Sequence, residues 1–425
     1  MSTVSCESCV SFIWEHLCRH FARKTMVDLP YEILADILSR LPAELVFSCE
    51  HACKPLGELM RTPSFVNIHL TRATGVYAFN YFSLDIDYDK EVKDSARNII
   101  VYLRDEVTQK LVSKSIKMEL GNTRHKKTCM PTIYGSYNGF LLFRNIRYDV
   151  VLFIWNPVTQ EHATVVAPHP GYRVRGLFFH KATQEYRVLY VSADEVDFRY
   201  YILSLKTKST RRIKSFSHPP CSLTNPVILK EVLHWMVCED SYNLRHKVYP
   251  PCSTSILLFD MNSEEFSTMS HPGSECLGKN CLEGNHSAMK LIEMEGFLGL
   301  CDQSSHKEIV IWILEDAEEN GWVKRFVLIE PIKLFYDMYT VMPVQVMHIF
   351  KDEVLLLLYY RELFMYNMRR RTLKRVNNFS DTLVYAVCHV NTFAAIHVDN
   401  IVYVSADVAG ESRGNIEWAK LVMDE

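Results

Sequence analysis

The 425-residue sequence lacks the short motifs of several large enzyme classes. It has no glycine-rich phosphate loop, no nucleophile elbow and no zinc-protease helix. It also lacks a strong charge, since its formal net charge is −3, so the chain as a whole attracts neither nucleic acid nor acidic membranes. We expect a protein that catalyses no reaction, holds no cofactor and no metal, and binds neither nucleic acid nor a membrane.

Signals for export and for membrane insertion are absent as well. The N-terminus has no basic region, and Glu7 and Glu15 interrupt its apolar residues, which argues against a secretory signal. The longest aliphatic run, Val354–Tyr360, is far shorter than the roughly 20 residues of a membrane span. The 13 cysteines are odd in number and follow no disulfide framework. These features predict a soluble protein of the cytoplasm, the nucleus or both.

Two groups of cysteine and histidine invite a zinc interpretation that their spacing disfavours. The first is the N-terminal set Cys6, Cys9, His16, Cys18 and His20. The gap between Cys9 and His16 is shorter than a zinc finger requires, because a hairpin and a helix must fit between the ligand pairs. The second is the evenly spaced set His271, Cys276, Cys281 and His286, which matches no structural zinc pattern. We expect neither set to bind metal.

A short helix is predicted at residues 30–41. Asp28 can accept hydrogen bonds from the first N–H groups, and Pro30 has the φ angle that a first turn needs. Pro42 disfavours the α conformation of the residue before it, so the helix should end near Leu41. A helix of about three turns is too short to persist alone in water.

The apolar residues of this helix form two adjacent rows. One row holds Ile33, Ile37 and Leu41, and the other holds Leu34 and Leu38. Two more short helices are predicted after Pro42, at residues 44–52 and 56–61. A unit of roughly 40 residues cannot bury enough surface to fold well without a disulfide, a metal or a partner. Part of the wide apolar face is therefore expected to contact another protein.

The same stretch resembles an F-box. The motifs, in order, are Leu29-Pro30-Tyr31-Glu32-Ile33-Leu34, Ile37-Leu38-Ser39-Arg40-Leu41-Pro42, Cys53-Lys54 and Pro63-Ser64-Phe65. In that family the motif binds a Skp-type adaptor and, through it, the cullin and RING subunits of a ubiquitin ligase. Leu56 stands where plant members usually have Trp, a residue type that often dominates interface energy. The resemblance implies an adaptor-binding set of Leu29, Pro30, Ile33, Leu34, Ile37, Leu38, Leu41, Pro42, Leu45, Cys53 and Leu56.

After Leu70 the pattern becomes strand-like to about Ala419, and one unit recurs in which an apolar strand, a tight polar turn and a second strand follow each other. The turns can be marked by Asn156, Lys206, Met261, Glu315 and Asn367, with gaps of 50, 55, 54 and 52 residues. A period near 50 is typical of kelch-type propellers.

A hairpin precedes most of these turns, which gives two hairpins per period and hence a four-stranded blade. The hairpin turns are predicted at Asn138-Gly139, Lys230-Glu231, Glu295-Gly296 and Lys351-Asp352. Five turn markers, with further strands at Val76–Leu120, predict about six blades, or seven, and Leu383–Ser405 should help to close the ring. Trp155, Trp235 and Trp312 lie in strands and are expected in the blade cores.

The strand region is similar to the F-box-associated interaction domain of plant F-box proteins. The motifs that carry this likeness are Asn138-Gly139-Phe140-Leu141-Leu142-Phe143, Ile154-Trp155-Asn156-Pro157, Val232-Leu233-His234-Trp235 and Ile309-Val310-Ile311-Trp312. The predicted fold class is α+β multidomain, a small N-terminal three-helix F-box followed by an all-β propeller-like domain. The expected divisions are a tail at 1–26, either with a short helix or without one, an F-box at 27–72 and a propeller-like domain at 75–420.

These resemblances imply the substrate-recognition subunit of a Skp–cullin–F-box ubiquitin ligase, with an unknown protein target bound by the propeller. The chain itself would perform no chemistry. The alternative, motivated by Leu56 in place of Trp, is a propeller scaffold with a vestigial F-box. A propeller enzyme is a third class, but no set of catalytic side chains is recognisable.

Overall fold

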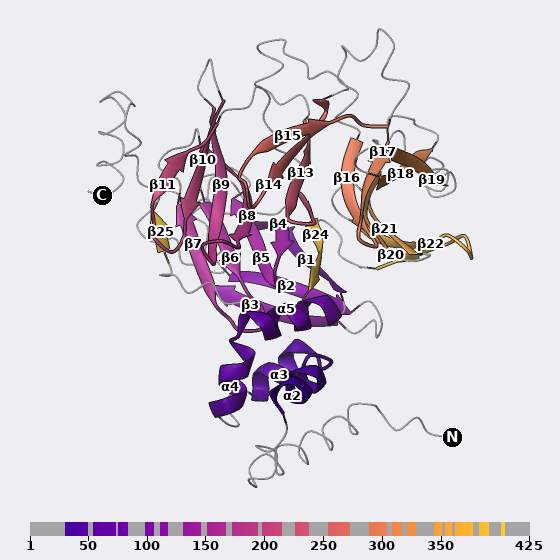
Figure 1. Cartoon of the computed structure of the whole chain (residues 1–425). Helices are drawn as coiled ribbons and strands as arrows, with labels where there is room; N and C mark the ends of the chain where they lie inside the picture. The colour runs from indigo at the N-terminus through magenta and orange to yellow at the C-terminus, as the bar shows by residue number, and fades with distance from the viewer. Residues whose placement is uncertain are drawn as a thin grey trace, which may run out of the picture.

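The structure is a computed structural model of the chain. It describes residues 30–49, 54–73, 75–83, 98–105, 111–117, 131–145, 151–166, 172–193, 198–214, 226–237, 254–272, 289–303, 308–316, 321–328, 344–350, 353–358, 362–376, 382–390 and 401–403. A small group of helices lies below a ring of β-sheets (Figure 1). Among the described helices, each is too short or too polar to cross a lipid bilayer.

The helical part contains one more helix than the sequence predicts. The described helices are α2 (Tyr31–Leu38), α3 (Ala43–Cys49), α4 (Lys54–Met60) and α5 (Pro63–Arg72). The first three match the predicted helices, apart from ends that differ by a few residues. The fourth, α5, begins at Thr62, whose hydroxyl oxygen accepts a hydrogen bond from the backbone N–H of Phe65 at 3.3 Å, and Pro63 occupies its first turn. Thr-Pro was therefore the overlooked signal for a helix start.

The start of α2 also differs in detail from the expectation. Pro30 is the N-cap residue, with φ −53° and ψ 140°, and α2 has no side-chain cap. Asp28, the predicted cap, lies outside the described residues. At the other end, the backbone N–H of Ser39 donates to the carbonyl of Ala35 at 2.9 Å, and α2 ends three residues before Leu41.

The described strands form six sheets, which are the blades of a propeller and are antiparallel except where β25 joins β7. Blade A holds β24 (Thr382–Val390), β1 (Gly75–Ser83), β2 (Asn98–Asp105) and β3 (Leu111–Lys117). Blade B holds β4 (Pro131–Tyr137), β5 (Phe140–Asn145), β6 (Val151–Trp155) and β7 (His162–Val166). Blade C holds β8 (Tyr172–His180), β9 (Glu185–Ala193), β10 (Phe198–Ser204) and β11 (Thr210–Arg212).

Three further blades complete the ring. Blade D holds β12 (Val227–Leu229), β13 (Val232–Met236), β14 (Ile256–Asp260) and β15 (Phe266–Met269). Blade E holds β16 (Met289–Met294), β17 (Phe297–Asp302), β18 (Ile309–Asp316) and β19 (Gly321–Leu328). Blade F holds β20 (Val344–Phe350), β21 (Glu353–Leu358), β22 (Glu362–Asn367) and β23 (Thr372–Arg375). The prediction of about six blades is confirmed.

Ring closure joins strands from the two ends of the propeller region. Strand β24 pairs along its whole length with β1, so that Ala386 lies opposite Phe79. Blade A therefore takes its first strand from the C-terminal region and its other three from the N-terminal region. The predicted closing segment, Leu383–Ser405, also contains β25 (Ile401–Tyr403), which instead pairs in parallel with β7 as a fifth strand of blade B.

The repeat is physically anchored by the turn between the third and fourth strands of a blade. Its first residue, Asn156, Ser204, Asp260 or Asn367, accepts backbone N–H bonds two or three residues ahead through its side-chain oxygen. The residue four positions on has a positive φ in each case: Gln160, Lys208, Glu264 and Arg371. The sequence marked the turns of blades C and D by Lys206 and Met261. The residues that correspond to Asn156 are instead Ser204 and Asp260, because their side-chain oxygens accept the equivalent hydrogen bonds.

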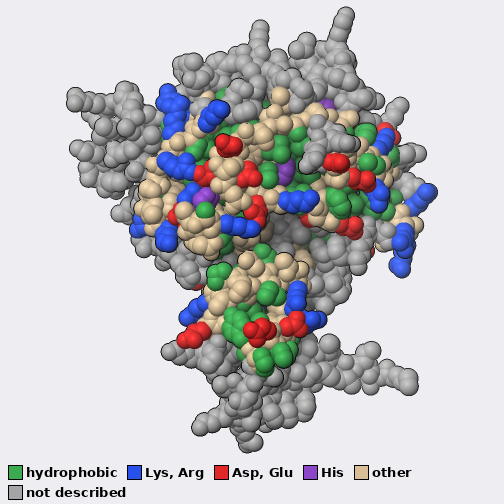
Figure 2. Space-filling model, in the orientation of Figure 1, with side chains coloured by type: hydrophobic (Ala, Val, Ile, Leu, Met, Phe, Trp, Pro, Cys, Tyr) green, Lys and Arg blue, Asp and Glu red, His purple; other side chains and the backbone are tan. Residues whose placement is uncertain are grey.

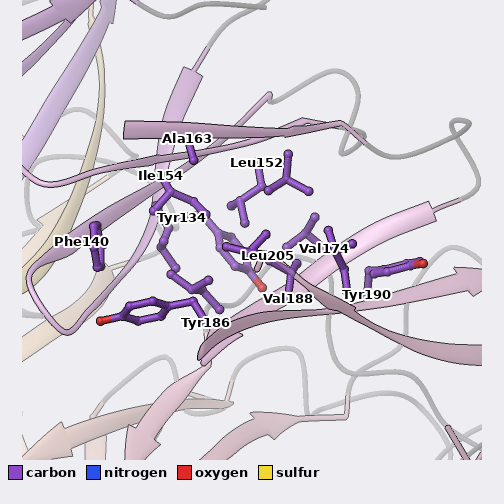
Figure 3. Close-up of a cluster of buried hydrophobic side chains, with 14 of the residues drawn as sticks. Tyr134, Phe140, Leu152, Ile154, Ala163, Val174, Tyr186, Val188, Tyr190 and Leu205 are labelled. Atoms are coloured by element: carbon purple, nitrogen blue, oxygen red, sulfur yellow. The ribbon is translucent and has the colours of Figure 1, made fainter. Parts of the chain in front are cut away.

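Hydrophobic side chains fill the six spaces between neighbouring blades. Side chains of one strand alternate between two spaces, so that Phe153 of β6 packs towards blade A and Ile154 towards blade C. Figure 3 shows the core between blades B and C, where Ile154 and Tyr134 lie near Tyr186 and Leu205. Because each blade buries both faces against its neighbours, no blade is expected to be stable without the ring.

The two faces of the ring differ in the lengths of their connections. On the face towards the helices, first and second strands are joined by as few as two residues, as at 138–139, and third and fourth strands by as many as six, as at 156–161. Antiparallel pairing places the remaining connections on the opposite face. These include the long segments 237–255 and 270–288. The opposite face therefore carries the longest connections between the described strands.

Candidate functional site

The first candidate site is the exposed apolar surface of the helical part. On α2, Tyr31 and Ile33 are each 48% exposed and Ile37 is 42% exposed, while Ile68 on α5 is 37% exposed. Ile33 and Ile37 are one turn apart, so their side chains lie on one face of α2. Figure 2 shows hydrophobic side chains exposed on the helical part below the ring. We call the exposed face of Ile33 and Ile37 the α2 surface.

The inner row of α2 is packed into a core instead. Leu38 is only 3% exposed and packs with Ala35, Val46 and Phe65, while Leu34 and Leu41 are half-buried at the edge of the same core. The two predicted rows therefore have different roles, but the prediction was wrong for Leu41, which was placed in the row of Ile33 and instead lies beyond the end of α2 at the edge of the core. The row of Leu38 holds the helices together, and the exposed row of Ile33 and Ile37 is available to a partner.

The structure places the remaining residues of the predicted adaptor-binding set as follows. Pro30 and Pro42 are exposed, and Leu45 is half-buried. Leu29 and Cys53 lie outside the described residues, and the side chain of Leu56 in α4 is not among those described. Whether any of the predicted residues contacts an adaptor stays a prediction. Tyr31, which was not in the predicted set, is also exposed, but it lies two residues from Ile33 and therefore on another side of α2.

Polar contacts tie α2 to α5 beside the α2 surface. Arg72 donates to Asp36 at 2.7 Å and to the hydroxyl of Ser39 at 2.6 Å, and Arg40 donates to Asp36 at 3.1 Å. Hydrogen bonds from Arg40 and then Arg72 lower the pKa of the Asp36 carboxyl, so this carboxylate is charged near neutral pH. Tyr31 contacts Thr62 through their hydroxyl groups at 3.0 Å. The contacts fix the direction of α2, and hence of its exposed row.

A buried histidine makes a second link between α5 and α2. His69 is 1% exposed, and its Nε2 atom lies 3.0 Å from the carbonyl oxygen of Leu41, just beyond α2. Burial lowers the pKa of His69, although the Leu41 carbonyl and nearby Glu44 act in the opposite direction. The neutral ring is therefore the form that the packed helices favour.

The helical part shares its core with blade B. Val158, in the turn after β6, is 5% exposed and packs with Val46, Leu59 and Phe65. From the other side, Val66 of α5 packs against the core between blades B and C. The helices and the ring are thus joined by two contacts: Val158 of the ring packs in the helical core, and Val66 of the helices packs against a core of the ring.

An ion pair reinforces this junction from blade A. The ammonium group of Lys114 on β3 lies 3.7 Å from the carboxylate of Glu44 on α3 and donates to the carbonyl of Pro157 at 2.9 Å. Lys114 is one-fifth exposed and Glu44 is nearly half exposed, so water screens the pair and its contribution is modest. The Lys114 side chain helps to fix the position of α3 on the ring, because it contacts both α3 and the turn that carries Val158.

Three tryptophans were predicted to lie in the blade cores, and the structure buries two of them there. Trp155 and Trp235 are 0% and 1% exposed in the blade cores. Trp312 is only partly buried beside the core between blades D and E, with the Lys324 ammonium 6.0 Å from the centre of its ring. Trp322, one strand further out, donates its indole N–H to the carbonyl of Ser270 at 3.2 Å. These contacts use the aromatic rings for packing between sheets.

The prediction that neither cysteine–histidine set binds a metal is not tested by the structure. Of the two sets, only His271 lies within the described residues, where it is buried. Across the described part of the chain, no three His, Cys, Asp or Glu side chains are grouped so as to hold a metal ion.

Comparison with known families identifies the ring. A family model described as the F-box associated beta propeller domain matches residues 93–397. An F-box protein of Arabidopsis thaliana is 23% identical over 320 residues, which cover 70% of this chain and 63% of that protein. F-box protein CPR1 of the same plant is 22% identical over 343 residues, covering 72% and 74%. This chain therefore spans less than two thirds of the first of these relatives.

Among solved structures, a nidogen/laminin complex gives a TM-score of 0.42 at 8% identity, covering 74% of this chain and 98% of that chain. An oligogalacturonate lyase in complex with manganese gives 0.35 at 11% identity, covering 71% and 78%.

Proposed function

Because the chain belongs to the family with an F-box associated beta propeller domain, we propose that it is the substrate-recognition subunit of a Skp–cullin–F-box ubiquitin ligase. The observation that supports this proposal best is the α2 surface. Two isoleucines on the first F-box helix face solvent although the helices have a packed core of their own. An apolar row left exposed at a fixed angle is what a partner of complementary shape would bury.

In this proposal the chain lowers no chemical barrier by itself. The F-box binds a Skp-type adaptor, the adaptor brings the cullin and RING subunits, and the propeller holds a protein target. Holding target and ligase in one assembly raises the effective concentration of acceptor lysines near the charged ubiquitin carrier. We propose that the target binds the ring face away from the helices, because the long connections belong to that face and the helices occupy the other.

The experiment uses substitutions that spare the helical core. Ile33→Asp combined with Ile37→Asp places two charges on the α2 surface, where the wild-type side chains are 48% and 42% exposed. Loss of a central interface anchor typically costs about 2 kcal/mol or more, which is roughly thirtyfold in affinity. Co-purification with a plant Skp-type adaptor should be abolished. Leu38→Asp is unsuitable, since Leu38 is buried and its loss would unfold the helices.

The matched control is Val323→Asp on β19, because Val323 is similarly exposed, at 39%, and lies on blade E away from the helices. It should retain the adaptor. Full adaptor binding by the Ile33/Ile37 variant would reject this interface.

The second candidate function is a propeller scaffold that engages no ligase. The observation that favours it is Leu56, which replaces the usual Trp of the plant motif. Immunoprecipitation of the full chain, probed for cullin, separates the two functions: a ligase subunit recovers cullin, whereas a scaffold recovers a target protein alone. We propose the cytoplasm or the nucleus as the site of action, to be checked by imaging a fluorescent fusion.

A further inference from the structure

The turn between β6 and β7 enters the core of the F-box helices, although it belongs to the propeller. Its residue Val158 is 5% exposed among Val46, Leu59 and Phe65, which come from three different helices. At the equivalent position of the blade C turn stands Lys206, and at that of blade D stands Asn262, both exposed. Blade B alone, of these three, carries an apolar residue there.

This turn is rigid because blade B itself holds its shape. Asn156 is fully buried, and its side-chain oxygen accepts from the N–H groups of Val158 at 2.8 Å and Thr159 at 3.3 Å. The backbone N–H of Asn156 donates to Glu161 at 2.9 Å, and the side-chain amide of Gln160 donates to Pro157 at 2.7 Å. None of these bonds involves a helix. The position of Val158 is therefore fixed by the ring, and its side chain packs into the core of the helices.

The helices need such support more than the ring does. They span only 7 to 10 residues each, and isolated helices of this length are unstable in water. A unit of this size has too little core to fold well alone. The junction with the ring also involves blade A, through the contact between Lys114 and Glu44. Blade A is complete only when β24 has paired with β1.

We propose that the blade B turn is part of the adaptor-binding module, so that the F-box is ordered, and able to bind the adaptor, only on a folded and closed propeller. Val158 acts as a positioning residue, since its side chain is buried among the helices that carry the α2 surface and works through them. A chain whose ring has failed to close would then present no ordered F-box to the ligase. Only the adaptor step of this inference rests on the proposed function.

The test is Val158→Asp in the full chain, with Lys206→Asp as the matched control in the blade C turn. Hydrogen exchange followed by mass spectrometry reports on helices and blades separately. In Val158→Asp, the amides of residues 31–72 should exchange at least tenfold faster than in the wild type, while the blade strands keep their rates. Lys206→Asp should match the wild type in both regions. Val158→Ile, which keeps an apolar side chain, should restore slow exchange in the helices.

Adaptor binding is the second readout, measured with a purified Skp-type adaptor of Arabidopsis thaliana. Val158→Asp should weaken binding at least tenfold, although Val158 lies outside the α2 surface. Unchanged exchange in residues 31–72 of Val158→Asp would overturn the proposal whatever the adaptor result. If the wild-type chain binds no adaptor but the exchange pattern is as expected, the proposed function fails and the dependence of the helices on the ring stands.

Discussion

The Asn156 side chain offers a quantitative test of what anchors each repeat. Asn156→Ala removes the oxygen that accepts two backbone N–H groups, at 2.8 and 3.3 Å, in a position with no exposed surface. A net contribution of about 1 kcal/mol per hydrogen bond, with a further penalty for leaving buried donors unsatisfied, predicts a loss of about 2–4 kcal/mol in unfolding free energy.

The chain supplies its own control for this substitution. Asn367 has the same role in blade F, where its side-chain oxygen accepts from the N–H of the exposed residue Arg370 at 2.8 Å. Water can replace that acceptor, so Asn367→Ala should cost about 1 kcal/mol. Asn156→Ser should cost less than Asn156→Ala, because Ser204 performs the same task in blade C with its hydroxyl oxygen.

Urea unfolding followed by far-UV circular dichroism measures these differences through the midpoint at constant slope. Hydrogen exchange of the amides of Val158 and Thr159 gives a local measurement on the same variants. Equal losses of unfolding free energy for Asn156→Ala and Asn367→Ala would refute the reasoning. Burial of the blade B turn would then add nothing to the cost of losing the side-chain acceptor.

Two further predictions concern pH and packing. Burial lowers the pKa of His69 below its ordinary value of 6.5, so the unfolded state binds the proton more readily; the stability of the helical part should be full above pH 6.5 and decline as the pH falls below it. Hydrogen exchange of residues 31–72 at pH 7.5 and 5.5, corrected for intrinsic rates, checks this, and His69→Gln should flatten the dependence. Gly299→Ala would place a Cβ atom 2.9 Å from Ile292 in the core between blades E and F, so a loss of about 1–3 kcal/mol is expected in urea unfolding. A variant as stable as the wild type would show that Ile292 can move aside freely.

The propeller was predictable because its signal is repeated and local. Turn pairs such as Asn138-Gly139 and Glu295-Gly296 favour positive φ angles, and the structure gives φ values of 48° and 82° for the first pair and 51° and 84° for the second. The period near 50 residues then follows from blade length. What the sequence could not align was the third-to-fourth strand turn, because Asn, Ser and Asp all supply the acceptor oxygen while the apolar residues beside them differ.

The α2 surface could be predicted only as a wide apolar face. Ile37 and Leu38 are adjacent, equally hydrophobic and both in the F-box motif, yet one is 42% and the other 3% exposed. Helical periodicity separates them into two rows, but it does not say which row faces the other helices. That choice depends on where α5 lies, and α5 was not predicted.

The position of Val158 was beyond the reach of sequence patterns for a different reason. Val158 is one residue of a polar turn in its own repeat, and no local preference marks it as part of a helical core formed by residues roughly 100 positions earlier in the chain. Only the docking of helices on the ring gives it that role. The same docking gives a reason for the order of the chain: an F-box just before β1 emerges beside blade A, where the ring is closed by β24, and next to the blade B turn. An F-box inserted before any later blade would sit away from the strand pairing that closes the ring, and its order would then say nothing about whether the ring had closed.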